Sequence, residues 1–149
     1  MPFSAMGHTD SCFTIDLGAI IANWRYINSL SSAATTTAAV VKANGYGLGA
    51  NHVAAALAQA GCTKFFVANL GEAISLRQHL DDLGYNQPQI MTLHGCYLYQ
   101  LEGHAEFRIT PVLNDLEQLS RWRMFGQQQS NKLPAILHID TGMTRLGFD

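Results

Sequence analysis

The sequence predicts an α/β protein in which about five βα repeats build a parallel sheet. Short apolar runs are centred near residues 40, 66, 91, 109 and 137, and a helical pattern separates each run from the next. This alternation is typical of parallel sheets whose connecting helices lie outside the strands. An open doubly-wound sheet and a (β/α)8 barrel share it. Because a barrel needs about 250 residues and eight strands, these 149 residues would form only its first part.

The individual elements follow from hydrophobic periodicity and from residues that begin or end helices and strands. Asn69 with Glu72, and Asn114 with Glu117, each resemble the start of a helix. Pro111 is expected to stop a strand, because proline has no backbone N–H. The predicted strands are residues 13–17, 38–41, 64–68, 89–93, 107–110 and 135–139. The predicted helices are residues 17–27, 50–60, 69–83, 97–101 and 114–125.

The composition is that of a globular protein, with 48% apolar and 13% charged residues. A net charge of −2 gives no reason to expect a nucleic acid or an acidic membrane as partner. Residues 1–11 lack the pattern of a secretory signal, and no run approaches the ~20 apolar residues of a membrane span. We therefore expect a cytoplasmic protein.

The cysteines and histidines predict neither a disulfide framework nor a metal site. Cys12, Cys62 and Cys96 are odd in number and far apart, which favours reduced structural thiols. Five of the six histidines, His8, His52, His79, His94 and His104, show no metal-ligand spacing. We expect no metal.

A lysine stands where the strand over residues 38–41 runs out into a glycine-rich loop. Lys42 is followed by Gly45, Tyr46 and Gly47. Ligands of parallel α/β proteins bind at the carboxyl ends of the strands, so an amine here is well placed for Schiff-base chemistry. Tyr46 is near enough in sequence to reach a ligand held there. The alternative interpretation is an ordinary lysine that reaches solvent beside a turn.

A second glycine-containing segment, DTGMTRLG, occupies residues 140–147 after the last predicted strand. Arg145 offers a fixed fork of donors to an anionic oxygen. Asp140 could orient the loop, and its two glycines permit unusual backbone angles. The alternative interpretation is an Asx-type turn that carries an arginine in solvent.

Together, AVVKANGYG at residues 39–47 and DTGMTRLG at residues 140–147 resemble the two N-terminal signatures of bacterial alanine racemase. FTIDL at residues 13–17 resembles the family's opening strand. The resemblance implies the N-terminal part of a TIM-type (β/α)8 barrel, pyridoxal 5'-phosphate as cofactor and racemisation of L-alanine to D-alanine for peptidoglycan precursors. It also implies a homodimer acting on a small amino acid. A racemase for serine or a similar amino acid, a non-catalytic pyridoxal-phosphate-binding protein and a truncated pseudo-enzyme remain alternatives.

The resemblance assigns roles to three residues. Lys42 would hold the cofactor and act as the base on the D-amino-acid face, Tyr46 would contact the cofactor phosphate, and Arg145 would approach the phenolic oxygen and the substrate carboxylate. The family's second base is a tyrosine from a C-terminal β-domain of the partner subunit. We therefore expect residues 1–149 to be a partial barrel domain without that β-domain, inactive by itself.

Three positions depart from the family's pattern. Gly45 stands where alanine is usual, and Leu48 stands where histidine is common. His138 occupies the position of a lysine, sometimes carbamylated, that pairs with the arginine. A neutral imidazole cannot supply a negative charge, so the sequence leaves open how Arg145 is positioned. A core histidine without a role at the site is the other interpretation of His138.

Overall fold

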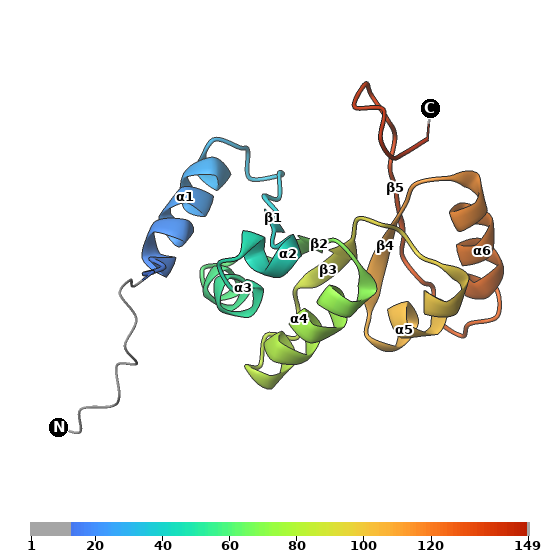
Figure 1. Ribbon diagram of the computed structural model, residues 1–149, viewed down its shortest axis with the longest axis horizontal. Helices are drawn as coiled ribbons and strands as arrows, with labels where there is room; N and C mark the ends of the chain where they lie inside the picture. The colour runs from blue at the N-terminus through green and yellow to red at the C-terminus, as the bar shows by residue number, and fades with distance from the viewer. Residues whose placement is uncertain (1–12, 149) are drawn as a thin grey trace.

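The computed structural model describes residues 13–148, and within them one sheet of five parallel strands (Figure 1). Cys12 and the segment considered as a secretory signal lie outside this range. The strand order is the sequence order, β1-β2-β3-β4-β5. The strands are β1 (Ala39–Val40), β2 (Lys64–Val67), β3 (Gln89–Thr92), β4 (Ile109–Leu113) and β5 (Ile136–Leu137).

The sequential strand order distinguishes between the two predicted architectures. In a doubly-wound sheet the order reverses at a switch point, whereas each crossover of a barrel steps in the same direction. Figure 1 shows the strands as a curved row with the connecting helices along its outer side, as in part of a barrel. The helices are α1 (Leu17–Ser29), α2 (Lys42–Tyr46), α3 (Ala50–Gln59), α4 (Leu70–Asp82), the 3-10 helix η1 (Leu98–Gln100), α5 (Leu101–Glu106) and α6 (Leu116–Gly126).

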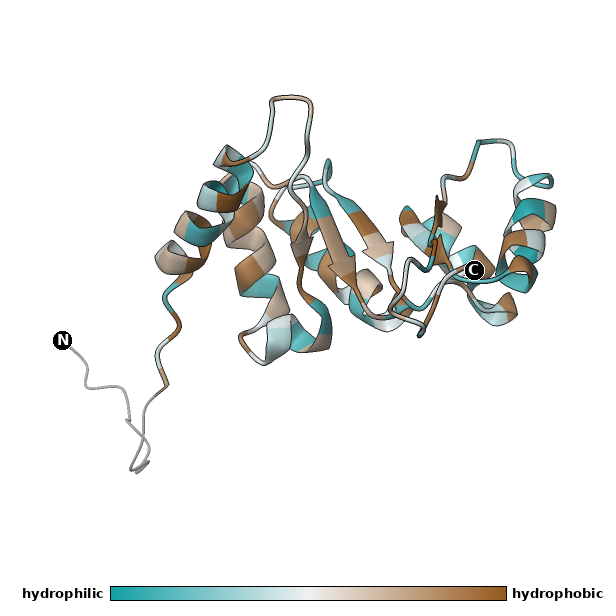
Figure 2. Cartoon of the chain, turned by 90° about the horizontal axis from the view of Figure 1, so that it is seen from above, coloured by the Kyte–Doolittle hydropathy of each residue, from teal (hydrophilic) through white to brown (hydrophobic). Residues whose placement is uncertain are grey.

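The hydrophobic core lies between the strands and their outer helices. Its larger cluster joins β1, β2 and β3 to α3 and α4, with Phe65, Leu80 and Ile90 fully buried. A smaller cluster packs β4 against α5 and α6 around Leu113 and Trp122. Figure 2 shows the predominantly hydrophobic strands between helices that carry many of the hydrophilic residues. Each large apolar side chain buried here contributes about 1.5–3 kcal/mol, so the core fixes the strand ends that carry the site.

The two outer strands differ from the inner ones. β1 and β5 have two residues each, while β2, β3 and β4 have four or five. Apolar side chains of the outer strands are exposed, Val40 by 45% and Leu137 by 52%. Both edges of the sheet therefore present apolar surface.

One predicted strand is absent. Residues 13–16 pair with no strand, and Asp16 instead begins α1 by accepting a hydrogen bond from the Ala19 N–H at 3.0 Å. An extended segment becomes a strand only where a neighbouring backbone supplies its hydrogen bonds. The apolar pattern of this segment predicted a strand, but the described residues offer it no partner.

Two predictions at the C-terminal end of β4 are also wrong. Pro111 lies within the strand, paired in register with Thr92. β5 pairs with β4 only at Val112 and Leu113, so that side of β4 has no partner strand at Pro111. Asn114 was predicted to begin α6, but the cap is the following residue, Asp115. Its carboxylate accepts the Gln118 N–H at 2.8 Å.

The cysteine prediction concerns two residues of the described range. Cys62 and Cys96 are free and buried. Burial raises the pKa of both thiols, that of Cys96 to about 12.

In residues 13–148 no group of three or more histidine, cysteine or acidic residues could hold a metal ion. None of the helices described is long and apolar enough to cross a membrane.

Candidate functional site

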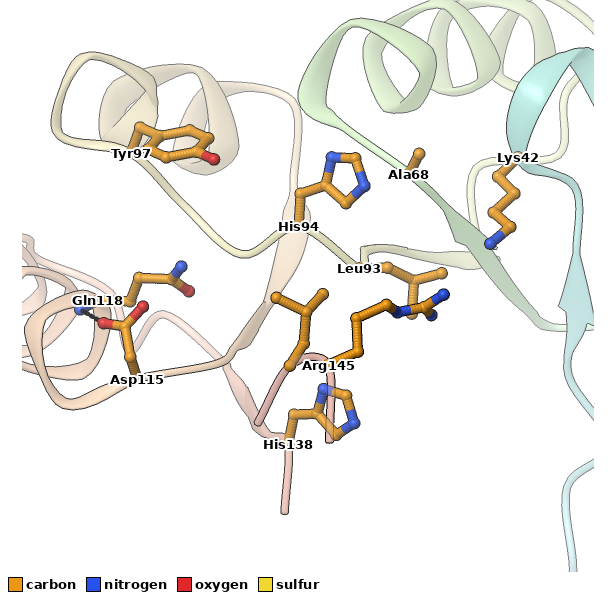
Figure 3. A pocket seen from close by; sticks show the side chains of 10 residues that line it. Lys42, Ala68, Leu93, His94, Tyr97, Asp115, Gln118, His138 and Arg145 are labelled. Atoms are coloured by element: carbon orange, nitrogen blue, oxygen red, sulfur yellow. Dashed lines mark hydrogen bonds between the residues drawn. The ribbon is translucent and has the colours of Figure 1, made fainter. Parts of the chain in front are cut away.

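A cavity of about 630 Å³ opens at the carboxyl ends of the strands. Residues that follow all five strands contribute to it, as expected for a ligand site in a parallel α/β fold. Figure 3 shows the Lys42 and Arg145 side chains reaching toward one another across it, from opposite ends of the sheet. The lining residues are Lys42, Ala68, Leu93, His94, Tyr97, Asp115, Gln118, His138, Arg145 and Leu146.

The chain turns in an unusual way immediately after Lys42. Five consecutive residues, 43–47, have positive φ angles between 51° and 86°. Each non-glycine residue in such a left-handed turn costs about 1–2 kcal/mol. Ala43, Asn44 and Tyr46 all carry that cost, so contacts from the rest of the fold must stabilise the turn.

Glu72 supplies the principal contact. Its Oε1 accepts the Ala43 N–H at 2.9 Å, and its Oε2 accepts the Ala68 N–H at 2.7 Å. The two peptides lie directly after β1 and β2, beside cavity-lining Lys42 and Ala68. Asn69 fixes Glu72 in turn, because its side chain accepts the Glu72 N–H at 3.1 Å and caps α4 as predicted. One carboxylate thus joins two strand ends at the lysine.

Asn44 and Gly45 complete the turn. The Asn44 Oδ1 accepts the Ala50 N–H at 3.0 Å and so satisfies a donor at the start of α3. Gly45 is buried, and a Cβ there would lie 3.1 Å from the Ala50 nitrogen. Tyr46 is 63% exposed and does not line the cavity. The structure therefore places Lys42 with Arg145 but leaves Tyr46 outside the cavity.

Asp140 organises the loop that carries Arg145. Its Oδ1 accepts the backbone N–H groups of Gly142, Met143 and Thr144 at 2.9–3.1 Å. These hydrogen bonds, that of Gly142 foremost, hold the pKa of Asp140 below its ordinary value of 3.8. The Asx-type turn considered for this loop is present, and the arginine it carries lines the cavity rather than facing solvent alone.

The loop closes on its own base. The Asp140 N–H donates to the Phe148 carbonyl, and the Phe148 N–H donates to the His138 carbonyl, both at 2.7 Å. Gly147 is required at this crossing, because a Cβ there would lie 2.9 Å from both the Asp140 nitrogen and the His138 oxygen. The closed loop keeps Arg145 over the carboxyl ends of the strands.

Two further residues belong to the site and were not predicted for it. Glu72 was interpreted only as a helix-start residue. Asn114 was interpreted as a helix cap, and its Oδ1 instead lies 2.8 Å from the His138 Nδ1. Both act across long stretches of sequence, 29 residues for Glu72 to Ala43 and 24 for Asn114 to His138. No local pattern would have revealed either contact.

The cavity suits an anionic aldehyde cofactor such as pyridoxal phosphate. The Lys42 amine can bind an aldehyde carbon, and the Arg145 guanidinium can hold an anionic oxygen. Within residues 13–148 the guanidinium forms no hydrogen bond or ion pair, so its donors are available to a ligand.

Comparison with known proteins supports this interpretation. The model of the family "Alanine racemase, N-terminal domain" matches residues 15–149. The alanine racemase of Brucella suis is 46% identical over 135 residues, which cover 91% of this chain and 33% of that protein. The chain spans about a third of the length of the curated relatives it matches.

Solved structures give the same result. The alanine racemase of Bartonella henselae, crystallised with covalently bound pyridoxal phosphate, is 41% identical with a TM-score of 0.80, over 91% of this chain and 36% of that one. A histidine racemase from Leuconostoc mesenteroides is 31% identical with a TM-score of 0.75, over 89% and 34%. The five-stranded sheet is accordingly part of a TIM-type barrel. The chain belongs to the alanine racemase family, whose N-terminal domain it matches.

Proposed function

We propose that the protein interconverts L-alanine and D-alanine with pyridoxal 5'-phosphate, and that this chain supplies the lysine side of the site. One observation carries the proposal: Lys42 and Arg145, from loops after the first and last strands, line one cavity at the carboxyl ends of a parallel sheet. The names of the relatives and the bound cofactor of the Bartonella enzyme support it.

Lys42, Arg145 and Tyr46 would each have a different role in this reaction. Lys42 would hold the cofactor and, when displaced by substrate, would remove or return a proton at its Nζ on the D face. The cofactor, when bound, supplies the electron sink that makes the α-proton removable. Arg145 would orient the phenolic oxygen of the cofactor and the carboxylate of the substrate through its fork of donors. Tyr46, exposed on the same turn as Lys42, would offer its hydroxyl to the phosphate.

Racemisation needs a second base on the opposite face of the substrate. We propose that this base is a tyrosine of a C-terminal β-domain, contributed by the partner subunit of a cytoplasmic homodimer. Residues 1–149 would then be one part of the barrel domain, and the 149-residue chain alone would not racemise alanine. Robust D-alanine formation by this chain, purified by itself, would contradict that division of the site.

The choice of amino acid is a separate question. A histidine racemase shares this fold at 31% identity, so the barrel does not by itself select the side chain. We propose alanine because the curated relatives carry that name. A panel of L-amino acids, including serine and histidine, given to the native protein would show which one it turns over fastest.

Reductive trapping tests the central claim. The chain has three lysines, Lys42, Lys64 and Lys132. After incubation with pyridoxal phosphate and borohydride, peptide mapping should find the label on Lys42. The Lys42→Ala variant should lose it, and the matched Lys132→Ala variant should keep it. Label confined to Lys64 or Lys132, or none in the native protein, would overturn the proposal.

A further inference from the structure

His104 is a buried titratable side chain that has no part in the proposed reaction. It lies on α5, is 0% exposed, and packs against Trp122 of α6 with the ring centroids 5.9 Å apart. Its Nδ1 lies 2.9 Å from the Gln100 carbonyl oxygen, and its Nε2 lies 3.0 Å from the Thr92 hydroxyl oxygen. Both nitrogens are therefore held, and the two partners limit where the ring can carry a proton.

Thr92 connects this histidine to the cavity. It is the last residue of β3 and is fully buried. The turn that follows it carries three of the residues that line the cavity, Leu93, His94 and Tyr97. Figure 3 shows the last two on the same side of the cavity. The Thr92 hydroxyl also lies 3.2 Å from the carbonyl oxygen of Gly95, within this turn. One hydroxyl therefore stands between the buried ring and the cavity wall.

A neutral ring cannot satisfy both contacts of the hydroxyl. A carbonyl oxygen only accepts hydrogen bonds, so the Nδ1 that faces Gln100 carries a proton. In a neutral ring Nε2 is then an acceptor, and the Thr92 hydroxyl donates its single proton to it. That proton is no longer available to the Gly95 carbonyl. The neutral form of His104 therefore leaves Gly95 without its hydroxyl donor.

A protonated ring removes this conflict. Nε2 then also carries a proton and donates to the Thr92 oxygen, so the hydroxyl proton can go to the Gly95 carbonyl. No heavy atom has to move, because both contacts of the Thr92 oxygen already have hydrogen-bond length. One proton added to His104 thus adds one hydrogen bond inside the turn.

The thiol beside the ring does not change this count. The Cys96 Sγ lies 3.4 Å from the His104 Nδ1. Burial raises the pKa of the thiol to about 12, so it stays neutral throughout the acid and neutral range. Its own proton has an acceptor in the Tyr97 carbonyl, 3.5 Å away. Nδ1 therefore keeps its proton for the nearer oxygen, that of Gln100.

Charged side chains lie outside the contact. On α5 itself Glu102 and Glu106 are exposed, and on α6 the charge of Arg121 acts on Cys96. Within residues 13–148 no carboxylate is hydrogen-bonded to the ring. Burial lowers the pKa of His104 below its ordinary value of 6.5, although the hydrogen bond to the Gln100 carbonyl acts in the opposite direction. The ring is therefore neutral at neutral pH and gains its second proton in acid.

We propose that proton uptake by His104 transfers the Thr92 hydroxyl from the ring to the Gly95 carbonyl and so tightens the turn that carries Leu93 and His94. This contact is a pH-sensitive device in the wall of the cavity. The gain of one neutral hydrogen bond makes opening of the turn about three- to tenfold rarer. By linkage, a ligand that binds only the closed turn favours protonation of the ring. The device needs neither the cofactor nor racemisation.

NMR spectra of the native chain test the transfer. At neutral pH the ring 15N shifts should show His104 protonated on Nδ1 alone. As the pH falls, Nε2 should gain a proton, and the 13C′ resonance of Gly95 should move downfield with the same midpoint, below the ordinary 6.5. Protection of the Gly95 N–H, relative to its intrinsic exchange rate, should rise about three- to tenfold through that midpoint. A His94→Asn background removes the neighbouring ring, whose titration would also move the Gly95 resonance.

Two substitutions at Thr92 distinguish the hydroxyl from the charge of the ring. Thr92→Val has nearly the same shape without the hydroxyl, so its Gly95 resonance should not follow the titration of His104. Thr92→Ser keeps the hydroxyl and should restore the native response. A native Gly95 resonance that ignores the titration, or one that follows it equally in Thr92→Val, would overturn the proposal. So would a ring already charged at neutral pH, or one that stays neutral until the chain unfolds in acid.

The proposed function is tested separately. Pyridoxal phosphate could label Lys42 while the Gly95 resonance ignores the titration of His104, which would remove the pH-sensitive contact alone. The resonance could follow the titration while Lys42 takes no label, which would remove the racemase proposal alone. The native spectra decide the transfer even if neither variant folds.

Discussion

Two loops bring Lys42 and Arg145 to the cavity, and a carboxylate holds the backbone of each. The two carboxylates differ in how far along the sequence they lie from the loop they hold. In each, one carboxylate accepts backbone N–H groups: one of the Lys42 turn and one after β2 in the first case, and three of the Arg145 loop in the second. For the Lys42 turn the carboxylate is Glu72, from another helix. For the Arg145 loop it is Asp140, the first residue of the loop itself. The first loop therefore depends on tertiary packing, and the second can form locally.

The environments of the two carboxylates differ as well. Glu72 is partly buried between the ends of β1 and β2, where hydrogen bonds to an ionised group are worth more than in water. Asp140 is half-buried too, but its three hydrogen bonds all go to residues of its own loop. Disturbing Glu72 should consequently affect the whole fold, whereas disturbing Asp140 or its glycines should affect the loop.

The largest effect is expected for Glu72→Gln. The amide keeps one acceptor, and its NH2 group faces a backbone N–H, so one donor loses its partner. We expect a loss of about 2–4 kcal/mol in the free energy of unfolding, measured in urea, and weaker labelling of Lys42 by pyridoxal phosphate. Glu117→Gln is the matched control, because among residues 13–148 Glu117 pairs only with Arg121 on the surface of α6, and it should cost less than about 0.5 kcal/mol. Equal losses of unfolding free energy in the two variants would show that the hydrogen bonds of Glu72 stabilise the fold no more than a surface ion pair does.

The next effect concerns the Arg145 loop. Gly142 and Gly147 have φ angles of 129° and 109°, so alanine at either position is strained by about 1–3 kcal/mol. Gly147→Ala also places a Cβ 2.9 Å from two backbone atoms, whereas Gly142→Ala meets open space. Amide exchange at Asp140 and Phe148 should therefore accelerate much more in Gly147→Ala. Similar acceleration in both variants would mean that the loop does not close as described.

The difference between the loops also explains what the sequence could predict. An aspartate followed two residues later by glycine is a local turn signal, so the role of Asp140 in its loop was foreseeable. Glu72 was interpreted as a helix-start residue because its partner at Ala43 lies 29 residues away. Asn114 was misassigned for the same reason: its amide serves His138, and neighbouring Asp115 caps α6.

The fold was predictable where the signal was local or apolar. The strands near residues 66, 91 and 137 match apolar runs, and Asn69 caps α4 as its spacing predicts. The strand over residues 13–17 was wrong because pairing depends on a neighbour that one segment cannot specify. Pro111 was misjudged because the missing N–H matters only where an adjacent strand requires it.

A smaller effect is the pH dependence of the Arg145 loop. The backbone N–H groups lower the pKa of Asp140 in the folded state. Its contribution to the loop is therefore present above the unfolded-state pKa and is lost as pH falls through the lower, folded-state value. The amide shifts of Gly142 and Thr144 should titrate with a midpoint below 3.8, the ordinary value. In Asp140→Asn this transition should vanish, and a native midpoint at or above the ordinary value would contradict the three hydrogen bonds.

The smallest effect should appear at the buried thiols, and it decides whether the two loops are independent. Burial raises the pKa of Cys62 and Cys96, so at pH 8 they react with a thiol reagent only after the core opens. In a Cys12→Ser background, Gly147→Ala should leave both rates unchanged, because its loop opens alone. Glu72→Gln should accelerate Cys62, which belongs to the cluster that joins β1 to α4. Acceleration of both thiols in both variants would show that the two loops unfold as one unit. The different sequence distances of Glu72 and Asp140 from their loops would then make no difference to the free energy of opening each loop.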